Sequence, residues 1–460
     1  MLRKSTIAAA IAATLAISNV NANEFSTTPT GTVQHIVNGK IVNTIHTYGI
    51  GEMPNIQKNI TYLNGIVDED YSQLQTDGVA KVQLDKTSFV NIKQGDKTTI
   101  TAFDKDIPFT SENTTIHDNG DTTWIGRNDN DQTATITFGV DGSVFGTFYD
   151  DHESYSIDTT ADGSTWLIAN EKSGRVSPSY ENDVPHNHHT ALNGIVVKVG
   201  GGTTTPTTPT VPTPTTTPTK VVIDVLVAVD PSLTNSATRI NQLIAVSNQA
   251  YIDSGIGHIS LRVVGTTALD MDDVIANDRI LSSISLTSSA QYKTLATSKT
   301  SLGADVVLYL RKYALTHNSC GVTYGNFMNG GVVNTSNYTA VVSDGTSGKY
   351  YCRPTTMVHE VGHLMGAVHD KQTMSSSGLG GSSLKGAFPY SYGYMFGTNG
   401  YGDIMSYSPT QVAKFSSPNI VYSTSSTGVK SYLGIIDQAD VVKTFTQTAP
   451  KLANFTATKN

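Results

Sequence analysis

The chain has 460 residues, of which 38% are hydrophobic and 15% are charged, and its formal net charge is −8. This length is enough for two or three folded units. The mild acidity and the lack of any Lys/Arg run disfavour a nucleic-acid binder, which needs a basic surface to hold phosphate. Thr, Ser, Asn and Gly replace the missing charge, a composition typical of exported β-rich proteins.

Residues 1–22 have the pattern of a secretory signal peptide. Arg3 and Lys4 precede an apolar run from Ile7 to Ile17, and Ala22 ends a small-residue cleavage site. The run is too short to cross a bilayer, which needs about 20 apolar residues. We expect cleavage after Ala22, a secreted, extracellular protein and no membrane span.

Residues 23–200 alternate apolar and polar positions and predict a β-rich N-terminal domain. Asp141-Gly142 separates two such runs, 134–138 and 144–148, as a hairpin turn does, and Asp162-Gly163 precedes another. Acidic stretches at 118–121 and 128–131 lack the Gly and terminal Glu of a calcium loop. Calcium is therefore an unsupported alternative to solvated turns.

Residues 201–219 read GGTTTPTTPTVPTPTTTPT and cannot bury a core. Such a Thr/Pro tract predicts an extended, semi-rigid linker. It separates the N-terminal domain from a second domain at 220–460. The linker either holds the two domains apart or exposes a site for proteolytic cleavage.

The second domain alternates strands and helices. Residues 221–229 are almost continuously apolar, which predicts a strand buried on both faces. A helical period follows, with Asn235 or Ser236 as its N-cap and Gly255 as its end. Further strands are expected at 259–263, 304–310 and 340–342. The pattern predicts an α/β domain with a mixed sheet.

The two cysteines, Cys320 and Cys352, are expected to form a disulfide in an oxidising compartment. The loop between them contains 31 residues. Closing it is worth about 3–4 kcal/mol in the chain-entropy model. A thiolate metal site would need more ligands at close spacing.

Three histidines have the spacing of a catalytic metal site. His359 and His363 are four residues apart, so on a helix both imidazoles point from one face, with Glu360 beside them. His369 would lie off that face if the helix continued, so we expect Gly366 to end the helix and let the chain return. Three imidazoles with one open position are the ligand set of a catalytic zinc ion.

The string His359-Glu360-x-x-His363-x-x-Gly366-x-x-His369 resembles the signature of the metzincin zinc endopeptidases, and Asp370 resembles their adamalysin/reprolysin branch. The segment 403–407, DIMSY, is similar to the Met-turn of that clan, with Met405 beneath the zinc ligands. Residues 220–455 as a whole resemble bacterial reprolysin-like and peptidyl-Asp metallopeptidases. The resemblance implies a zincin-type α/β (α+β) fold with an active-site helix, one zinc ion, and hydrolysis of protein or peptide substrates.

The resemblance also implies roles for individual residues. Glu360 is expected to act as general base on the attacking water and then protonate the leaving amine, without binding zinc. Tyr407 is either a catalytic group near the developing oxyanion or an ordinary packing residue. Asp370 is expected to support the ligands rather than to bind metal.

Residues 23–200 resemble the propeptides of such enzymes, and no cysteine precedes Cys320 to block zinc in a zymogen. Four pre-linker residues could occupy the open zinc position instead, although a polar loop is the favoured reading of the segment: Asp183, His186, His188 and His189. The competing class for the whole chain is a surface or secreted adhesin, or a glycan-binding protein, with a secondary or inactive zinc domain. Retention of residues 23–200 in the mature protein would favour it.

Substrate preference remains open, with host glycoproteins and matrix among the alternatives. A preference for Asp would require a cation in the specificity pocket. The sequence offers six without selecting one: Arg311, Lys312, Lys349, Arg353, Lys371 and Lys385.

Overall fold

The computed structural model describes residues 33–37, 40–45, 59–66, 68–150, 153–178, 218–325, 327–328, 331–333, 338–376, 386–396, 400–423 and 430–459. The signal segment, most of the linker and the four pre-linker latency candidates, Asp183, His186, His188 and His189, lie outside these residues.

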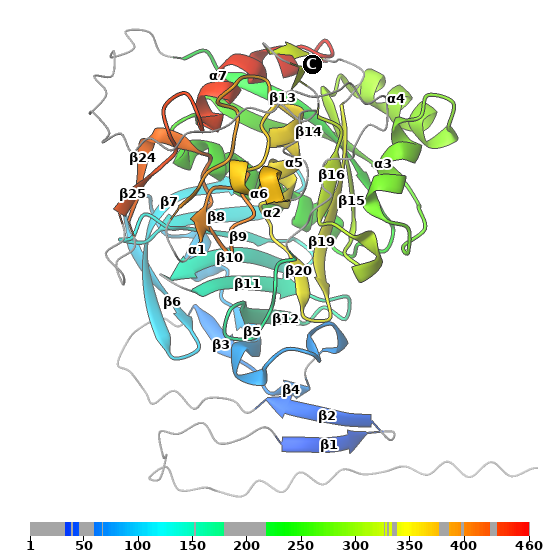
Figure 1. Cartoon of the computed structure of the whole chain (residues 1–460). Helices are drawn as coiled ribbons and strands as arrows, with labels where there is room; N and C mark the ends of the chain where they lie inside the picture. Colours follow the sequence, from blue (N-terminus) through cyan, green and yellow to red (C-terminus); the bar gives the residue numbers. More distant parts are fainter. Residues whose placement is uncertain are drawn as a thin grey trace, which may run out of the picture.

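An antiparallel sheet of nine strands forms the N-terminal unit, in the order β3-β5-β12-β11-β10-β9-β8-β7-β6 (Figure 1). Both predicted Asp-Gly turns are present, with Gly142 at φ 89° and Gly163 at φ 81°. The two end strands approach each other, because the Asn59 side-chain amide donates to the Thr98 hydroxyl at 2.7 Å. The sheet therefore curls towards closure. Its strands are β3 (Ile60–Tyr62), β5 (Val79–Leu84), β6 (Lys97–Ala102), β7 (Lys105–Ile116), β8 (Thr122–Arg127), β9 (Thr133–Phe138), β10 (Val144–Asp150), β11 (Glu153–Thr159) and β12 (Thr165–Ala169).

Large side chains fill the inside of this curled sheet. Trp124 is fully buried, and its ring packs edge-on against Phe89 and Phe109 at centroid distances of 5.2 and 6.3 Å. Its indole N–H donates to the Ser111 hydroxyl at 3.1 Å, so burial leaves no polar atom unpaired. The β-rich N-terminal region predicted from alternation is confirmed, and its interior is a packed core.

The C-terminal unit is built on a mixed sheet, as predicted, with strand order β14-β13-β15-β19-β16. The first three pairings are parallel, and β16 runs antiparallel to β19 at the edge. A short strand, β20, also pairs antiparallel with β19. The strands are β13 (Val221–Val229), β14 (Ile259–Ala268), β15 (Val306–Lys312), β16 (Gly321–Thr323), β19 (Thr339–Ser347) and β20 (Tyr350–Cys352).

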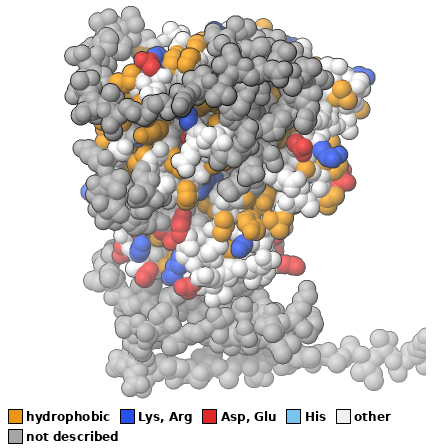
Figure 2. Space-filling model, viewed as in Figure 1, with side chains coloured by type: hydrophobic (Ala, Val, Ile, Leu, Met, Phe, Trp, Pro, Cys, Tyr) orange, Lys and Arg blue, Asp and Glu red, His pale blue; other side chains and the backbone are white. Residues whose placement is uncertain are grey.

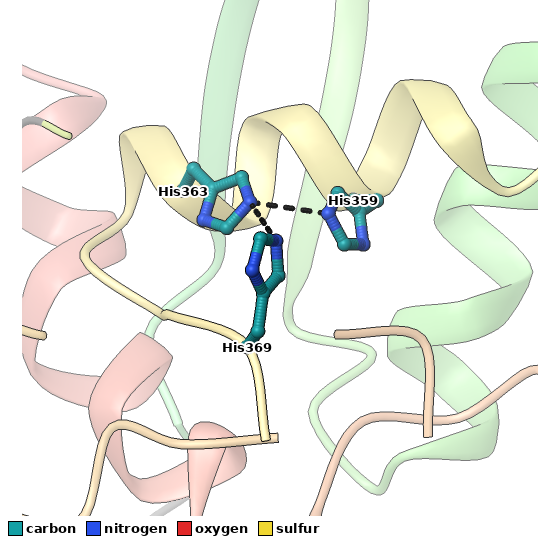
Figure 3. Close-up of side chains that lie close together, drawn as sticks. All are labelled: His359, His363 and His369. Atoms are coloured by element: carbon teal, nitrogen blue, oxygen red, sulfur yellow. Dashed lines mark hydrogen bonds between the residues drawn. The ribbon is translucent and has the colours of Figure 1, made fainter. Parts of the chain in front are cut away.

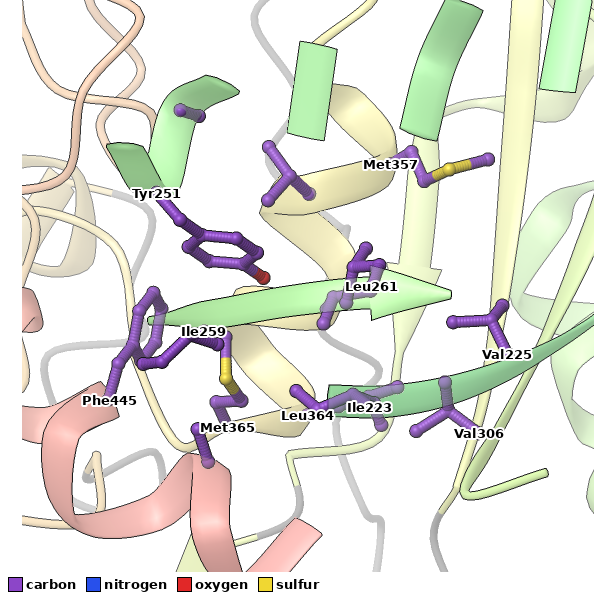
Figure 4. Packing of buried hydrophobic residues seen from close by; sticks show 14 of the residues in the cluster. Ile223, Val225, Tyr251, Ile259, Leu261, Val306, Met357, Leu364, Met365 and Phe445 are labelled. Atoms are coloured by element: carbon purple, nitrogen blue, oxygen red, sulfur yellow. The ribbon is translucent and has the colours of Figure 1, made fainter. Parts of the chain in front are cut away.

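Helices cover both faces of this sheet and bury a core on each. On one face Tyr251 of α2, Met365 after α5 and Phe445 of α7 pack on strands β13 to β15 (Figure 4). The helix predicted after Asn235 is present, but Asn235 does not cap it, because its backbone is left-handed at φ 50° and its side chain makes no cap bond. The helices are α2 (Ser236–Asp253), α3 (Asn277–Ser285), α4 (Ala290–Leu302), α5 (Thr356–Leu364), α6 (Lys371–Ser376) and α7 (Val441–Leu452).

Short elements complete the two units. They are β1 (Val33–Val37), β2 (Lys40–Ile45), β4 (Gly65–Ile66), α1 (Thr87–Val90), β17 (Phe327–Met328), β18 (Val332–Val333), β21 (Met395–Phe396), β22 (Tyr401–Gly402), β23 (Thr410–Gln411), β24 (Ser417–Ser423) and β25 (Lys430–Leu433), with 3-10 turns at Glu69–Tyr71, Thr76–Gly78 and Leu315–His317. Among the described residues, no helix is both long and apolar enough to cross a bilayer. Charged side chains lie scattered among uncharged ones on the face seen in Figure 2.

The two units meet through polar contacts along α2. The Thr137 hydroxyl of β9 donates to Gln242 at 2.6 Å, and the Gln242 amide donates to the backbone of Thr135 at 3.0 Å. Deeper in the interface, Arg239 makes a bidentate pair with Asp344, and Asp158 of the N-terminal unit lies 3.9 Å from the same guanidinium. An interface of hydrogen bonds and ion pairs, rather than a continuous apolar core, is typical of units that can separate.

The acidic turns considered as calcium loops use their carboxylates in this interface. Asp121 accepts from the Asn241 side chain at 2.9 Å, and Asp131 pairs with Lys414 and Arg127. Protein donors therefore satisfy these carboxylates.

Candidate active site

The site is built on helix α5, whose side chains are almost all buried. Met357, Val361 and Leu364 anchor one face in the core above the sheet. His359 and His363 lie one turn apart and project from another face. A helix held by its apolar face thus presents two imidazoles with fixed positions.

Gly366 ends the helix and reverses the chain. Its φ is 89°, its N–H donates to His363 O at 2.9 Å, and the N–H of Ala367 donates to Gly362 O at 3.0 Å. This pair of bonds is the Schellman motif, which requires a left-handed residue that glycine adopts without strain. The reversal returns His369 to the other two histidines, as the sequence predicts.

The three imidazoles converge with their Nε2 atoms (Figure 3). His363 Nε2 lies 3.1 Å from both His359 Nε2 and His369 Nε2. His359 Nδ1 faces Ile404 O at 2.7 Å, and His363 Nδ1 faces Ala367 O at 2.9 Å. Because a carbonyl oxygen only accepts, both Nδ1 atoms carry the proton, and both Nε2 atoms present lone pairs to the common point.

This arrangement fits a metal ion. Lone pairs facing each other at 3.1 Å repel unless a cation lies between them. The three side chains are at most 7% exposed, so water does not screen that repulsion. Among the described residues, His359, His363 and His369 form a group whose ligand atoms lie close enough together to hold a metal ion. Neutral imidazoles held in this way by backbone carbonyls are ligands of the kind that zinc prefers.

Glu360 lies beside the ligands and against strand β16. A Cβ atom placed on Gly321 would come within 2.2 Å of Glu360 Oε1. Only a glycine therefore allows the carboxylate to lie so close to the strand. The local sequence pattern gives no sign of the contact between Gly321 and Glu360, so the sequence alone did not predict that Gly321 makes room for the carboxylate.

Met405 lies beneath helix α5, where a Cβ atom on Gly362 would come within 2.7 Å of its sulfur. The buried carboxylate of Asp403 supports this turn by accepting from the backbone N–H groups of Tyr394 and Ser416, at 3.0 and 2.8 Å. Burial raises the pKa of Asp403 to about 7. The turn that carries Met405 is thus held from inside the protein.

Asp370 and Tyr407 lie on the far side of His369. The Asp370 carboxylate accepts from the Thr373 N–H at 2.9 Å and contacts the Tyr407 N–H at 3.4 Å. The Tyr407 ring lies 4.3 Å from the His369 ring and lines the cavity described below. Asp370 therefore ties the third ligand's loop to the turn that carries Tyr407.

Cys320 and Cys352 are joined in a disulfide with a Cα–Cα distance of 5.3 Å. Cys320 directly precedes β16, and Cys352 ends β20. The bond holds these two short strands together beside the site.

A cavity of about 350 Å³ opens beside His359 and Glu360, and Tyr407 lines another part of its wall. Arg353 also lines it, together with Val176 of the N-terminal unit. The N–H of Val176 donates to Lys349 O at 2.8 Å and its carbonyl accepts from the Tyr351 N–H at 3.1 Å, so this segment pairs with β20. Sequence reasoning did not find the Val176 contact, because it joins residues far apart in the chain.

Comparison with known proteins agrees with the geometry. Residues 219–433 match the family described as metallo-peptidase family M12B, reprolysin-like, and residues 66–173 match the BamI lipocalin-like domain. A peptidyl-Asp metalloendopeptidase of Stenotrophomonas maltophilia (strain K279a) is 30% identical over 199 residues, which cover 41% of this chain and 42% of that protein. The chain thus matches less than half the length of this relative.

Solved structures resemble the chain more loosely. Metalloproteinase-II from Bacteroides fragilis superposes with a TM-score of 0.40 and 12% identity, over 69% of this chain and 86% of that one. A chain from a chaperone-substrate complex superposes with a TM-score of 0.37 and 17% identity, over 69% of this chain and 45% of that one. The family match, which includes all three histidines, identifies the C-terminal unit: residues 219–433 form a reprolysin-like metallopeptidase domain of family M12B.

Proposed function

We propose that this protein is a secreted, zinc-dependent endopeptidase of the metzincin type that hydrolyses peptide bonds in extracellular proteins. The observation that carries the proposal is the convergence of three buried imidazoles beside a glutamate, where His359 and Glu360 line a cavity. The basic start and short apolar run of residues 1–22 support secretion.

His359, His363 and His369 would hold the zinc ion. When bound, zinc would polarise the scissile carbonyl and favour ionisation of water near neutral pH. The backbone carbonyls of Ile404 and Ala367 fix the protonation of two imidazoles, so those ligands are oriented before metal arrives.

Glu360 would move the proton. Its carboxylate, set against Gly321, lies on the cavity wall next to His359 and is placed to accept a proton from the attacking water. The same carboxyl would then protonate the leaving amine. Tyr407 also lines the cavity, with its ring next to that of His369, and its hydroxyl would donate to the developing oxyanion.

The N-terminal unit would restrict access to this site and so act as a propeptide. Its segment 176–178 lines the cavity itself, and Val176 pairs with the backbone of β20. The Arg175 guanidinium stacks on the Tyr351 ring at 4.5 Å and anchors the segment. Removal of the unit would expose both the edge of β20 and the cavity.

The test compares the purified secreted protein with its Glu360→Gln variant on an unfolded protein substrate, and sequences the cleaved ends. Loss of the general base should lower the rate by roughly 10²- to 10⁴-fold. A zinc chelator should abolish the remaining activity, and added zinc should restore that of the wild type.

Metal content separates the roles of base and ligand. Glu360→Gln should keep one zinc per chain, whereas His363→Ala should lose it. Equal cleavage by the wild type and Glu360→Gln, or full activity in chelator, would overturn the proposed function.

A further inference from the structure

Two arginines line the cavity beside the candidate site, in addition to Glu171 and Glu360. Its two cationic lining residues are Arg353, which follows β20, and Arg175, which belongs to the N-terminal unit. If that unit departs, Arg353 alone of these two stays with His359 and Glu360. Arg353 is therefore the cationic lining residue that the cavity would keep.

Arg353 is fixed in place from several directions. It follows Cys352, which the disulfide joins to Cys320. Its NH1 group donates to Ser408 O at 3.3 Å and its NH2 group to Pro409 O at 2.9 Å. A guanidinium has five N–H donors, so two bonds to carbonyls orient the group and leave donors for a carboxylate.

The other candidate cations have different surroundings. Arg311 is fully buried and donates to Ile275 O and Asp272 O, both at 3.0 Å, and Lys312 pairs with Asp70 at 3.0 Å. Lys349 and Lys371 lie over the rings of Tyr350 and Tyr392, at 5.5 and 5.3 Å. Lys385 lies outside the described residues. None of the four described alternatives lines the cavity.

The N-terminal unit contributes acidic side chains to this cavity and to an adjoining one. Glu171 lines both this cavity and an adjoining one, and Arg353 lines both as well. Glu153 lines the adjoining cavity. While the N-terminal unit is docked, the Glu171 side chain therefore shares both cavities with Arg353, and an acidic substrate would bring a carboxylate to the same guanidinium after the unit has left.

From this geometry we infer that Arg353 is a specificity-determining residue that binds the carboxylate of an acidic side chain in the substrate. Asp is the acidic residue to test first, because the Stenotrophomonas relative is named for it. This inference deepens the proposed function and depends on it. A planar, pre-oriented guanidinium recognises a carboxylate through paired N–H donors, and a neutral isostere cannot make those bonds in full. The pair Asp and Asn therefore isolates the charge from the size of the side chain.

The experiment measures kcat/KM of the secreted protein on two peptides that differ only in Asp or Asn at the cleaved bond. The wild type should prefer Asp, and Arg353→Gln should lower the Asp:Asn ratio by roughly 10- to 100-fold, the range for a charged hydrogen bond. Arg353→Lys should keep part of the preference, because it retains the charge without the fork. Lys349→Gln, on the same hairpin but outside the cavity wall, should keep the wild-type ratio.

Two results would overturn the inference while leaving the peptidase intact. One is a wild-type enzyme that cleaves both peptides equally, which needs no variant. The other is an Arg353→Gln protein that binds zinc normally and keeps the full Asp:Asn ratio. Failure of the wild type to cleave any substrate faster than Glu360→Gln would instead count against the proposed function itself.

Discussion

The N-terminal and C-terminal sheets of this chain differ in how close their edge strands lie to one another. The N-terminal sheet curls until its end strands, β3 and β6, come within hydrogen-bonding reach, and it fills the enclosed space with Trp124 and other aromatic side chains. The C-terminal sheet stays open, and its edge strand β16 lies beside Glu360. The N-terminal sheet curls around its own packed core, whereas the open edge at β16 can receive another chain. The candidate active site therefore lies in the C-terminal unit, whose sheet has an open edge.

The largest expected effect comes from opening the packed sheet. Trp124→Ala would remove a fully buried ring and should lower the free energy of unfolding of the N-terminal unit by about 3–5 kcal/mol. Both tryptophans of the chain, Trp124 and Trp166, belong to this unit, so fluorescence of Trp166 reports its unfolding alone. We expect its denaturant midpoint to fall while zinc release keeps the wild-type midpoint.

Trp124→Phe is the matched control for this change, because it keeps an aromatic ring in the core and should have a smaller effect. Parallel shifts of the fluorescence and zinc-release midpoints would show that the two sheets unfold as one cooperative unit, which would contradict the comparison.

An intermediate effect is expected where the N-terminal unit reaches the second sheet. Val176→Pro removes the N–H that donates to Lys349 O, which should weaken the pairing with β20 by about 1 kcal/mol. The Tyr351 amide, which donates to Val176 O, should then exchange its hydrogen about fivefold faster. Exchange is best measured in a Glu360→Gln background, which under the proposed function cannot cleave itself, with Val176→Ala as the control that keeps the N–H. Unchanged protection of Tyr351 in Val176→Pro would show that the segment does not depend on this strand pairing.

The smallest effect concerns Glu153 and Glu171, an acidic pair that lines the cavity adjoining the candidate active site. Burial and the nearby Glu171 carboxylate raise the pKa of Glu153 from 4.5 to about 8. Since the unfolded chain loses this proton first, the stability of the folded protein should fall as the pH rises from about 4.5 to about 8 and then level off. Glu153→Gln should remove that loss and raise the Tm at pH 8 by about 1–3 °C, with no gain at pH 4. Glu69→Gln, at an exposed site, is the control, and an equal gain at both pH values would exclude the titration of Glu153 as the cause.

Local patterns carried most of what the sequence could predict. The hairpins around Gly142 and Gly163, the buried strand 221–229 and the helix break at Gly366 depend on neighbouring residues, so the sequence shows them directly. The convergence of the three histidines follows from the same local geometry. The failed cap at Asn235 shows the limit of this approach, because its backbone is left-handed and its side chain makes no cap bond.

Contacts between distant segments could not be predicted. The pairing of Val176 with β20 joins two units, and the approach of Glu360 to Gly321 joins a helix to a strand 39 positions away. Neither contact has a periodic signal. The choice of Arg353 among six cations is of the same kind, because it depends on which loop folds over which wall.

Under the proposed mechanism, Gly321 would link substrate binding to proton transfer. It belongs to the edge strand that an extended peptide could join, and it also sets how closely the Glu360 carboxylate can approach that strand. A peptide that shifted β16 by a few tenths of an ångström would move the backbone of Gly321, against which the Glu360 carboxylate packs. If Glu360 is the base, a poorly fitting substrate would then be cleaved slowly, even where it binds tightly, because its own binding displaces the carboxylate.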